Sequence, residues 1–164
     1  MSTGATNGPN GGARYSFPRQ EIVDAIVEGC SDASEDLILR IQKGIRDNLG
    51  KPGSGNWYVG QPARSSKPGE PPATQTGRLW NAWQAKPKRF GMARVIGWAI
   101  GSGRVPYARI LEYGGTTGRG GSTRIDKRPY IAPAVVDVQR IAPRVFADYI
   151  YNSISRRLGK ARGT

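Results

Sequence analysis

The chain has 164 residues, no histidine, one cysteine and a formal net charge of +13 at pH 7. This length fits one domain with a real core, because a chain of this size buries about 68–70% of its unfolded surface on folding. The lack of histidine excludes Ser-His-Asp and Cys-His catalysis and histidine-ligated metals. Cys30 alone cannot form an intramolecular disulfide and suits a reducing compartment.

The positive charge is spread along the chain from Arg14 to Arg162 instead of forming one basic helix. Basic surfaces gain affinity for nucleic acid through counterion release at phosphates. Cations also suit the negative end of a helix dipole, so solvated helix ends and contacts to acidic partners explain the charge equally well. The densest group is a candidate contact to DNA or to an acidic partner: Arg156, Arg157, Lys160 and Arg162.

Residues 1–16 are rich in Gly, Asn, Ser and Thr and lack the apolar run of a signal peptide or membrane span, which predicts a flexible arm. The next region, Phe17–Leu49, has apolar residues at helical spacing, with Ser16 placed to cap it and Pro18 in its first turn. Residues 29–31 interrupt the stripe, and residues 32–35 have the form of a capping box. The pattern predicts two helices, or one with a kink.

Residues 51–73 are rich in Pro, Gly and Ser, with one short strand candidate at Asn56–Val59. A loop of this length inside a compact domain usually serves binding or assembly. Pro68, Pro71 and Pro72 restrict the backbone and lower the entropy lost on docking. A docking segment is therefore expected, with a simple spacer as the alternative.

Thr76 is placed to cap a short helix containing Leu79, Trp80 and Trp83, which Pro87 should end. Residues 94–100 are β-branched and apolar on both faces, which predicts a strand central in its sheet. The following Gly-Ser-Gly is a turn and not a nucleotide-binding fingerprint, because no third glycine follows at the required spacing.

Pro106 can open another short helix, which Gly114 should end. Glu112 lies off its apolar face, so it is a candidate for a charge contact with one of the many arginines, in the same chain or on a neighbouring subunit; the alternative is a plain exposed carboxylate. Residues 114–127 are glycine-rich and basic. They predict a mobile loop that orders only on assembly, although backbone amides in such a loop can also cradle a phosphate.

Residues 128–131 predict a short edge strand, because Pro129 removes one ladder donor. From Pro133 apolar residues follow a 3.6-residue period as far as Leu158, and Gly159 should end this helix. Pro143 should kink it.

These elements predict an α+β fold in which long N- and C-terminal helices pack on a small, mainly antiparallel sheet with extended projecting loops. The expected organisation is a flexible N-terminal arm at residues 1–16, a single domain at 17–159 and a basic C-terminal tail at 160–164. Catalysis has little support, because the twelve Asp and Glu residues are mostly isolated or on helix faces.

Three blocks stand out: KPGEPPATQTGRL at residues 67–79, YARILEYG at 107–114 and RPYIAPA at 128–134. In this order and spacing they resemble the small tail-component family of tailed bacteriophages, also called neck or tail-completion proteins. Members of that family carry PGEPPA-x-x-TG-x-L, YA-x-x-LE-aromatic-G and RP-aromatic-x-x-PA. The chain departs from the family after Tyr113, where two glycines and two threonines precede a longer Gly/Arg/Ser loop.

The resemblance implies a structural virion protein and no enzyme. It would assemble in the host cytoplasm into a closed ring of its own copies, six-fold in preference to twelve-fold, at the head–tail junction. Its partners would be head-side connector or adaptor proteins, tail terminator or tail tube proteins, and packaged DNA without sequence specificity, with no membrane and no cofactor or metal. The alternative is a basic nucleic-acid-binding accessory protein, and an enzyme of unrecognised type comes third. The subunit-interface candidates are Pro68, Gly69, Glu70, Pro71, Pro72, Glu112, Arg119, Arg124 and Arg128.

Overall fold

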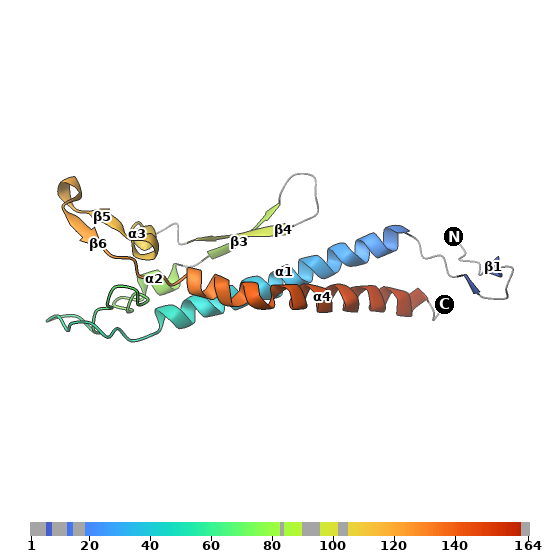
Figure 1. Cartoon of the computed structure of the whole chain (residues 1–164), viewed down its shortest axis with the longest axis horizontal. Coiled ribbons are helices and arrows are strands. Elements are labelled where there is room, and N and C mark those ends of the chain that lie inside the picture. The colour runs from blue at the N-terminus through green and yellow to red at the C-terminus, as the bar shows by residue number, and fades with distance from the viewer. Residues whose placement is uncertain are drawn as a thin grey trace.

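The computed structural model describes residues 6–7, 13–14, 19–82, 84–89, 96–101 and 105–161. Two long helices, α1 (Arg19–Leu49) and α4 (Ala132–Ala161), run antiparallel and side by side along the molecule (Figure 1). Shorter elements lie mainly on one side of this helix pair in the figure. They are α2 (Arg78–Asn81), β3 (Gln84–Arg89), β4 (Ile96–Gly101), α3 (Ala108–Tyr113), β5 (Gly115–Thr117), the 3₁₀ turn η1 (Arg119–Gly121) and β6 (Thr123–Ile125). The fold is α+β.

The helix pair packs through a stripe of α1 residues spaced four apart, the ridge that commonly fits between helices. Small side chains in its first half bring the backbones close together: a Cβ on Gly29 would lie 2.7 Å from Cα of Ile150. Gly44 faces Ala134 in the same way: a Cβ added to Gly44 would lie 2.9 Å from the Cβ of Ala134. The buried stripe consists of Ala25, Gly29, Ala33, Leu37, Ile45 and Leu49.

The predicted interruption at residues 29–31 is wrong, because α1 is one continuous helix from Arg19 to Leu49. Gly29 is explained by the close approach of α4 and not by a helix end. The helix from Pro133 is confirmed as α4, which passes through Pro143 and continues two residues beyond Gly159. Within the predicted N-terminal arm only β1 (Thr6–Asn7) and β2 (Ala13–Arg14) are described, and they pair antiparallel. The expected capping residues at positions 16 and 18 lie outside the described residues.

The described strands form three separate antiparallel pairs, β1–β2, β3–β4 and β5–β6. The strand predicted at residues 94–100 appears as β4, but among the described strands it pairs with β3 alone and is not central. Pro87 lies inside β3, so its expected role as a helix stop is wrong; α2 already ends at Asn81. Trp83 lies outside the described residues. The region 114–127, predicted as a loop, contains the β5–β6 hairpin.

Two other predicted strands, at residues 56–59 and 128–131, do not form in the part of the chain that the structure describes. Residues 56–59 form an exposed irregular segment of the loop that follows α1. Residues 128–131 lead into α4 without strand pairing, because their backbone N–H groups bond to α3 instead. The N–H of Arg128 donates to the carbonyl of Leu111. The N–H groups of Tyr130 and Ile131 donate to the carboxylate of Glu112.

The main core lies where α1 ends, α4 begins and α2 and α3 cover the junction. Tyr130 and Ile45 are completely buried there, and Leu49, Leu79 and Ala134 join them. The core therefore lies beneath the three sequence blocks singled out above.

Candidate assembly site

The second and third blocks meet at the N-terminus of α4, where the carboxylate of Glu112 accepts three backbone hydrogen bonds. Tyr130 N lies 2.8 Å and Ile131 N 3.0 Å from Oε2, and Ala132 N lies 2.8 Å from Oε1. The N–H groups of Ile131 and Ala132 are among those that a helix start leaves without an intrahelical acceptor, and a negative charge there also interacts favourably with the helix dipole. Glu112 on α3 thus caps α4 from outside its own segment.

Glu112 is only 5% exposed, so the alternative of a plain exposed carboxylate is wrong. Its bonds are made inside one subunit, which removes the basis for assigning it to a subunit interface. One sequence signal could have found this role: residues 128–131 contain no Ser, Thr, Asp or Asn to cap the long helix that follows. The orphan donors therefore needed an acceptor from elsewhere in the chain.

Tyr130 links the same junction to α1 and α3. Its ring is fully buried, and its hydroxyl donates to the carbonyl of Ala108 at 3.3 Å. Asn48 on α1 donates its side-chain amide to the carbonyl of Tyr130 at 3.0 Å. Three elements distant in the sequence are therefore held together by one aromatic residue and its backbone.

Hydrogen bonds connect the first block to the third through the residues that precede each block, Ser66 and Lys127. Ser66 Oγ donates to Pro71 O and accepts from Ala73 N, both at 2.6 Å. Arg128 Nε donates to Ser66 O at 3.3 Å, and Gly69 N donates to Lys127 O at 3.0 Å. The proline-rich segment is thus anchored to the body of the subunit. Pro72 is buried and Pro71 half-buried, whereas Pro68 and Gly69 are exposed.

Glu70 organises the remainder of this loop. Its carboxylate accepts from Lys67 N at 3.0 Å and from Ser54 N at 3.3 Å, and also from the Ser54 hydroxyl. The bond from the Ser54 hydroxyl, followed by the Lys67 amide, lowers the pKa of Glu70 below its ordinary value. Glu70 therefore fixes the fold of the loop, whatever further contact it makes with a partner.

Some predicted interface residues do come together at the surface. A hollow of about 560 Å³ lies between the proline-rich segment and the β5–β6 hairpin, and Pro68, Gly69 and Arg124 all line it. Arg119 is exposed in η1 but does not line this hollow. Arg124 lies 3.8 Å from Asp126, and both side chains are exposed.

The described part of the basic group, Arg156 and Arg157, lies near the C-terminal end of α4, at the opposite end of the helix pair (Figure 1). Arg157 Nη2 bonds to Glu28 Oε2 at 2.9 Å, and Arg156 lies 3.7 Å from Glu28 and 3.8 Å from Asp32. The Arg157 hydrogen bond, opposed by desolvation and assisted by the charges of both arginines, lowers the pKa of Glu28. Two of the four candidate DNA contacts thus join α4 to α1. The side chain of Lys160 and all of Arg162 lie outside the described residues.

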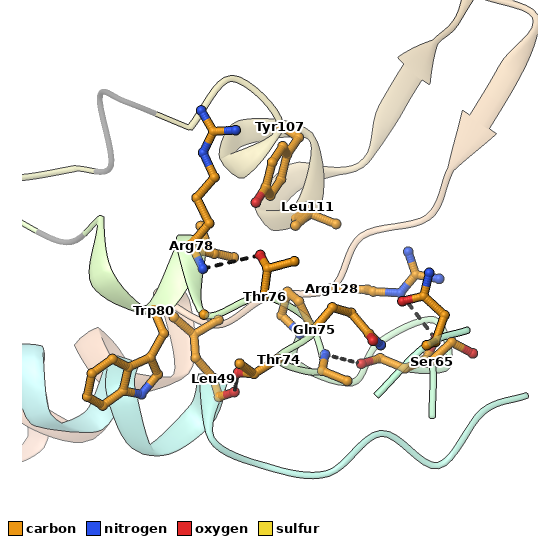
Figure 2. A pocket seen from close by; sticks show the side chains of 16 residues that line it. Leu49, Ser65, Thr74, Gln75, Thr76, Arg78, Trp80, Tyr107, Leu111 and Arg128 are labelled. Carbon is orange, nitrogen blue, oxygen red and sulfur yellow. Dashed lines mark hydrogen bonds between the residues drawn. The ribbon is translucent and has the colours of Figure 1, made fainter. Parts of the chain in front are cut away.

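A second hollow, here called the motif cavity, lies between the loop after α1, α2 and α3, and has a volume of about 470 Å³ (Figure 2). Trp80 and Tyr107, 41% and 40% exposed, are part of its lining, and the guanidinium of Arg46 lies 5.6 Å from the centre of the Trp80 ring. Two of the predicted subunit-interface residues, Pro72 and Arg128, are part of its lining, but nothing in the sequence indicated a cavity here. Its lining is Leu49, Gln61, Ser65, Ser66, Pro72, Ala73, Thr74, Gln75, Thr76, Gly77, Arg78, Leu79, Trp80, Tyr107, Leu111 and Arg128.

Comparisons with protein-family models, curated proteins and solved structures gave no match. Within the described ranges, no three Cys, Asp or Glu side chains gather to hold a metal ion. No helix in that part of the chain is long and apolar enough to cross a membrane.

Proposed function

We propose that this chain is a structural virion protein of a tailed bacteriophage, one subunit of a ring in the neck that joins the head connector to the tail around the DNA channel. The proposal includes the finer fold expectation that long helices and a small antiparallel sheet present extended loops to neighbouring subunits. It assigns no catalytic step and no cofactor to the chain.

The observation that carries the proposal is the hydrogen-bonded junction of the three sequence blocks that resemble the tail-component family. Glu112 of the second block caps the helix that begins in the third, and Arg128 of the third block binds the loop of the first at Ser66. The blocks therefore form one structural unit, which is the behaviour expected of a family's shared scaffold. The exposed Pro68 and Gly69 lie at its surface.

Deletion of the gene in the phage that encodes it tests this proposal. We expect filled heads and separate tails in electron micrographs of the deletion lysate, and joined infectious particles when the chain is supplied from a plasmid. Antibody labelling of complemented particles should fall at the head–tail junction. Joined infectious particles made without the chain would rule the proposal out.

A second candidate function, nucleic-acid binding, is favoured by the distribution of charge. Residues 78–131 contain eleven Lys and Arg against two Asp and Glu, whereas α1 contains seven acids and four bases. One of those two acids, Glu112, is buried, and the side chains described as exposed in this segment include five basic ones against Asp126 alone: Arg78, Arg109, Arg119, Arg124 and Lys127. A protein that contacts several phosphates loses orders of magnitude in DNA affinity between about 50 and 200 mM salt. A steep salt dependence in a DNA titration would favour this candidate, and weak binding with a shallow dependence would favour the structural role.

A further inference from the structure

We propose that the motif cavity receives the outer face of α1 from a second copy of this chain, with Leu39 entering the cavity and Glu35 pairing with Arg78 at its rim. This contact rests on the ring of the proposed function and gives it a specific subunit interface. The contact joins two different patches, so it is heterologous and repeats from copy to copy.

The cavity has the chemistry of a receptor for an apolar residue beside a carboxylate. Leu49, Leu79 and Leu111 give it apolar walls, and its lining contains two arginines and no Asp or Glu. Arg128 uses Nε to hold Ser66 O, but the Arg78 guanidinium makes no ion pair or hydrogen bond with any residue that the structure describes. Figure 2 shows the Arg78 side chain extending past Tyr107. Arg78 is therefore available to an acidic partner.

The outer face of α1 has the complementary chemistry. Leu39 is 62% exposed, and Glu35 precedes it by four residues and so lies on the same helix face. Glu35 is exposed and makes no ion pair or hydrogen bond within the described part of the chain. Four of the other five exposed acids have a basic partner nearby: Asp47 with Lys43, Asp126 with Arg124, Asp137 with Arg140 and Asp148 with Arg144. The fifth, Glu21, lies in the first turn of α1.

The uncharged aromatic tip at residues 57–59 is a poorer occupant. Trp57, Tyr58 and Val59 are all strongly exposed and could fill apolar space, but they would cover Arg78 without pairing its charge. The α1 face of the same subunit cannot reach the cavity either. Leu39 lies ten residues before Leu49, which is about 15 Å along the helix, and Leu49 lines the cavity. A second copy is the occupant that matches both the apolar walls and the charge of the cavity.

Charge exchange tests the contact. Glu35→Arg and Arg78→Glu alter exposed side chains, so each variant should fold, and each should weaken self-association about tenfold. The double variant should recover most of the loss, because it restores the pair in reverse. Glu21→Arg and Arg109→Glu are matched controls at exposed positions outside the cavity and should associate as the unaltered chain does. Self-association is measured by analytical ultracentrifugation; single variants that associate normally, or a double variant without recovery, would overturn the contact.

Cysteine cross-linking separates failure of this contact from failure of the ring. In a Cys30→Ser background, Leu39→Cys with Thr76→Cys should give a ladder of disulfide-linked oligomers. Within one subunit Leu39 lies about 15 Å along α1 from Leu49, which lines the same cavity as Thr76, and a disulfide needs Cα atoms within roughly 7 Å. Leu39→Cys with Ser122→Cys, a position on the β5–β6 turn, should give none. Rings seen by electron microscopy without a ladder would overturn this contact and leave the ring in place. A chain that stays monomeric at high concentration would overturn both.

Discussion

Glu112 Oε1 lies 2.8 Å from the backbone N of Ala132, the first residue of α4 and twenty positions further along the chain. A carboxylate on a six-residue helix thereby sets where a thirty-residue helix begins. The short helix in turn keeps its position because Tyr130, beside the cap, is buried against it. The two helices are therefore expected to fold as one unit.

Removal of this cap should be among the most damaging single changes in the chain. Glu112→Ala leaves three backbone donors at a buried site without an acceptor, and we expect a loss of about 3 kcal/mol in the free energy of unfolding. Glu112→Gln keeps one oxygen but directs an NH₂ group at the amides and should also destabilise. Glu35→Ala, at an exposed carboxylate, should stay within about 0.5 kcal/mol of the unaltered chain. Urea denaturation measures all three, and a small effect of Glu112→Ala would show that water replaces the carboxylate.

Helix packing gives a second prediction, at Gly29. Gly29→Ala places a methyl group 2.7 Å from the backbone of Ile150, which cannot move without separating the helices, so we expect a loss of about 1–3 kcal/mol. Gly159→Ala is the matched control, since a Cβ there meets nothing within 4 Å and glycine is a poor helix former. That variant should gain up to about 1 kcal/mol. Equal effects of the two substitutions on thermal unfolding would contradict the close packing.

The sequence pattern was sufficient to predict the elements whose formation depends on neighbouring residues in the chain. Helical periodicity predicted α1 and α4, and Gly114 correctly ends α3, where its positive φ of 76° suits glycine. Gly29 was misread because glycine is locally a helix breaker. Its actual role depends on a helix more than a hundred residues away, which no local pattern contains.

The candidate site was only partly predictable for the same reason. The three blocks pointed to segments that meet in the fold, but not to the burial of Glu112 or to the bond by which Arg128 holds the proline-rich loop at Ser66. β3 was missed because Pro87 suggests a helix stop, and proline is also tolerated in an edge strand. The motif cavity is built from three separate segments and exists only after folding.

Acid should destabilise the protein through Glu28 and Glu70, whose pKa values lie below the ordinary 4.5 in the folded state. Such groups stabilise the fold fully above their unfolded pKa, and the contribution is lost as pH falls through 4.5 toward the lower folded pKa. The urea midpoint should therefore fall on acidification below about pH 5. Arg157→Gln removes the main cause of the Glu28 shift, and Ser54→Ala that of Glu70. Each variant should show a smaller fall of the urea midpoint below about pH 5 than the unaltered chain. If the pH dependence of the midpoint is unchanged in both variants, other carboxylates cause the acid sensitivity.

The proline-rich segment should divide into a part that supports folding and a part that supports assembly. Pro72 is buried beside the core, so Pro72→Gly removes packing and adds freedom to the unfolded chain, with an expected loss of about 1–3 kcal/mol. Pro68 is exposed and lines the hollow shared with Arg124. Pro68→Gly should therefore cost at most about 1 kcal/mol in the isolated subunit, yet lower the yield of joined particles, because the more flexible segment loses more entropy on docking. Thermal unfolding and complementation of the deletion phage are measured on the same two variants. If Pro68→Gly complements fully, the segment is a folding element only and its exposed face makes no contact in the particle.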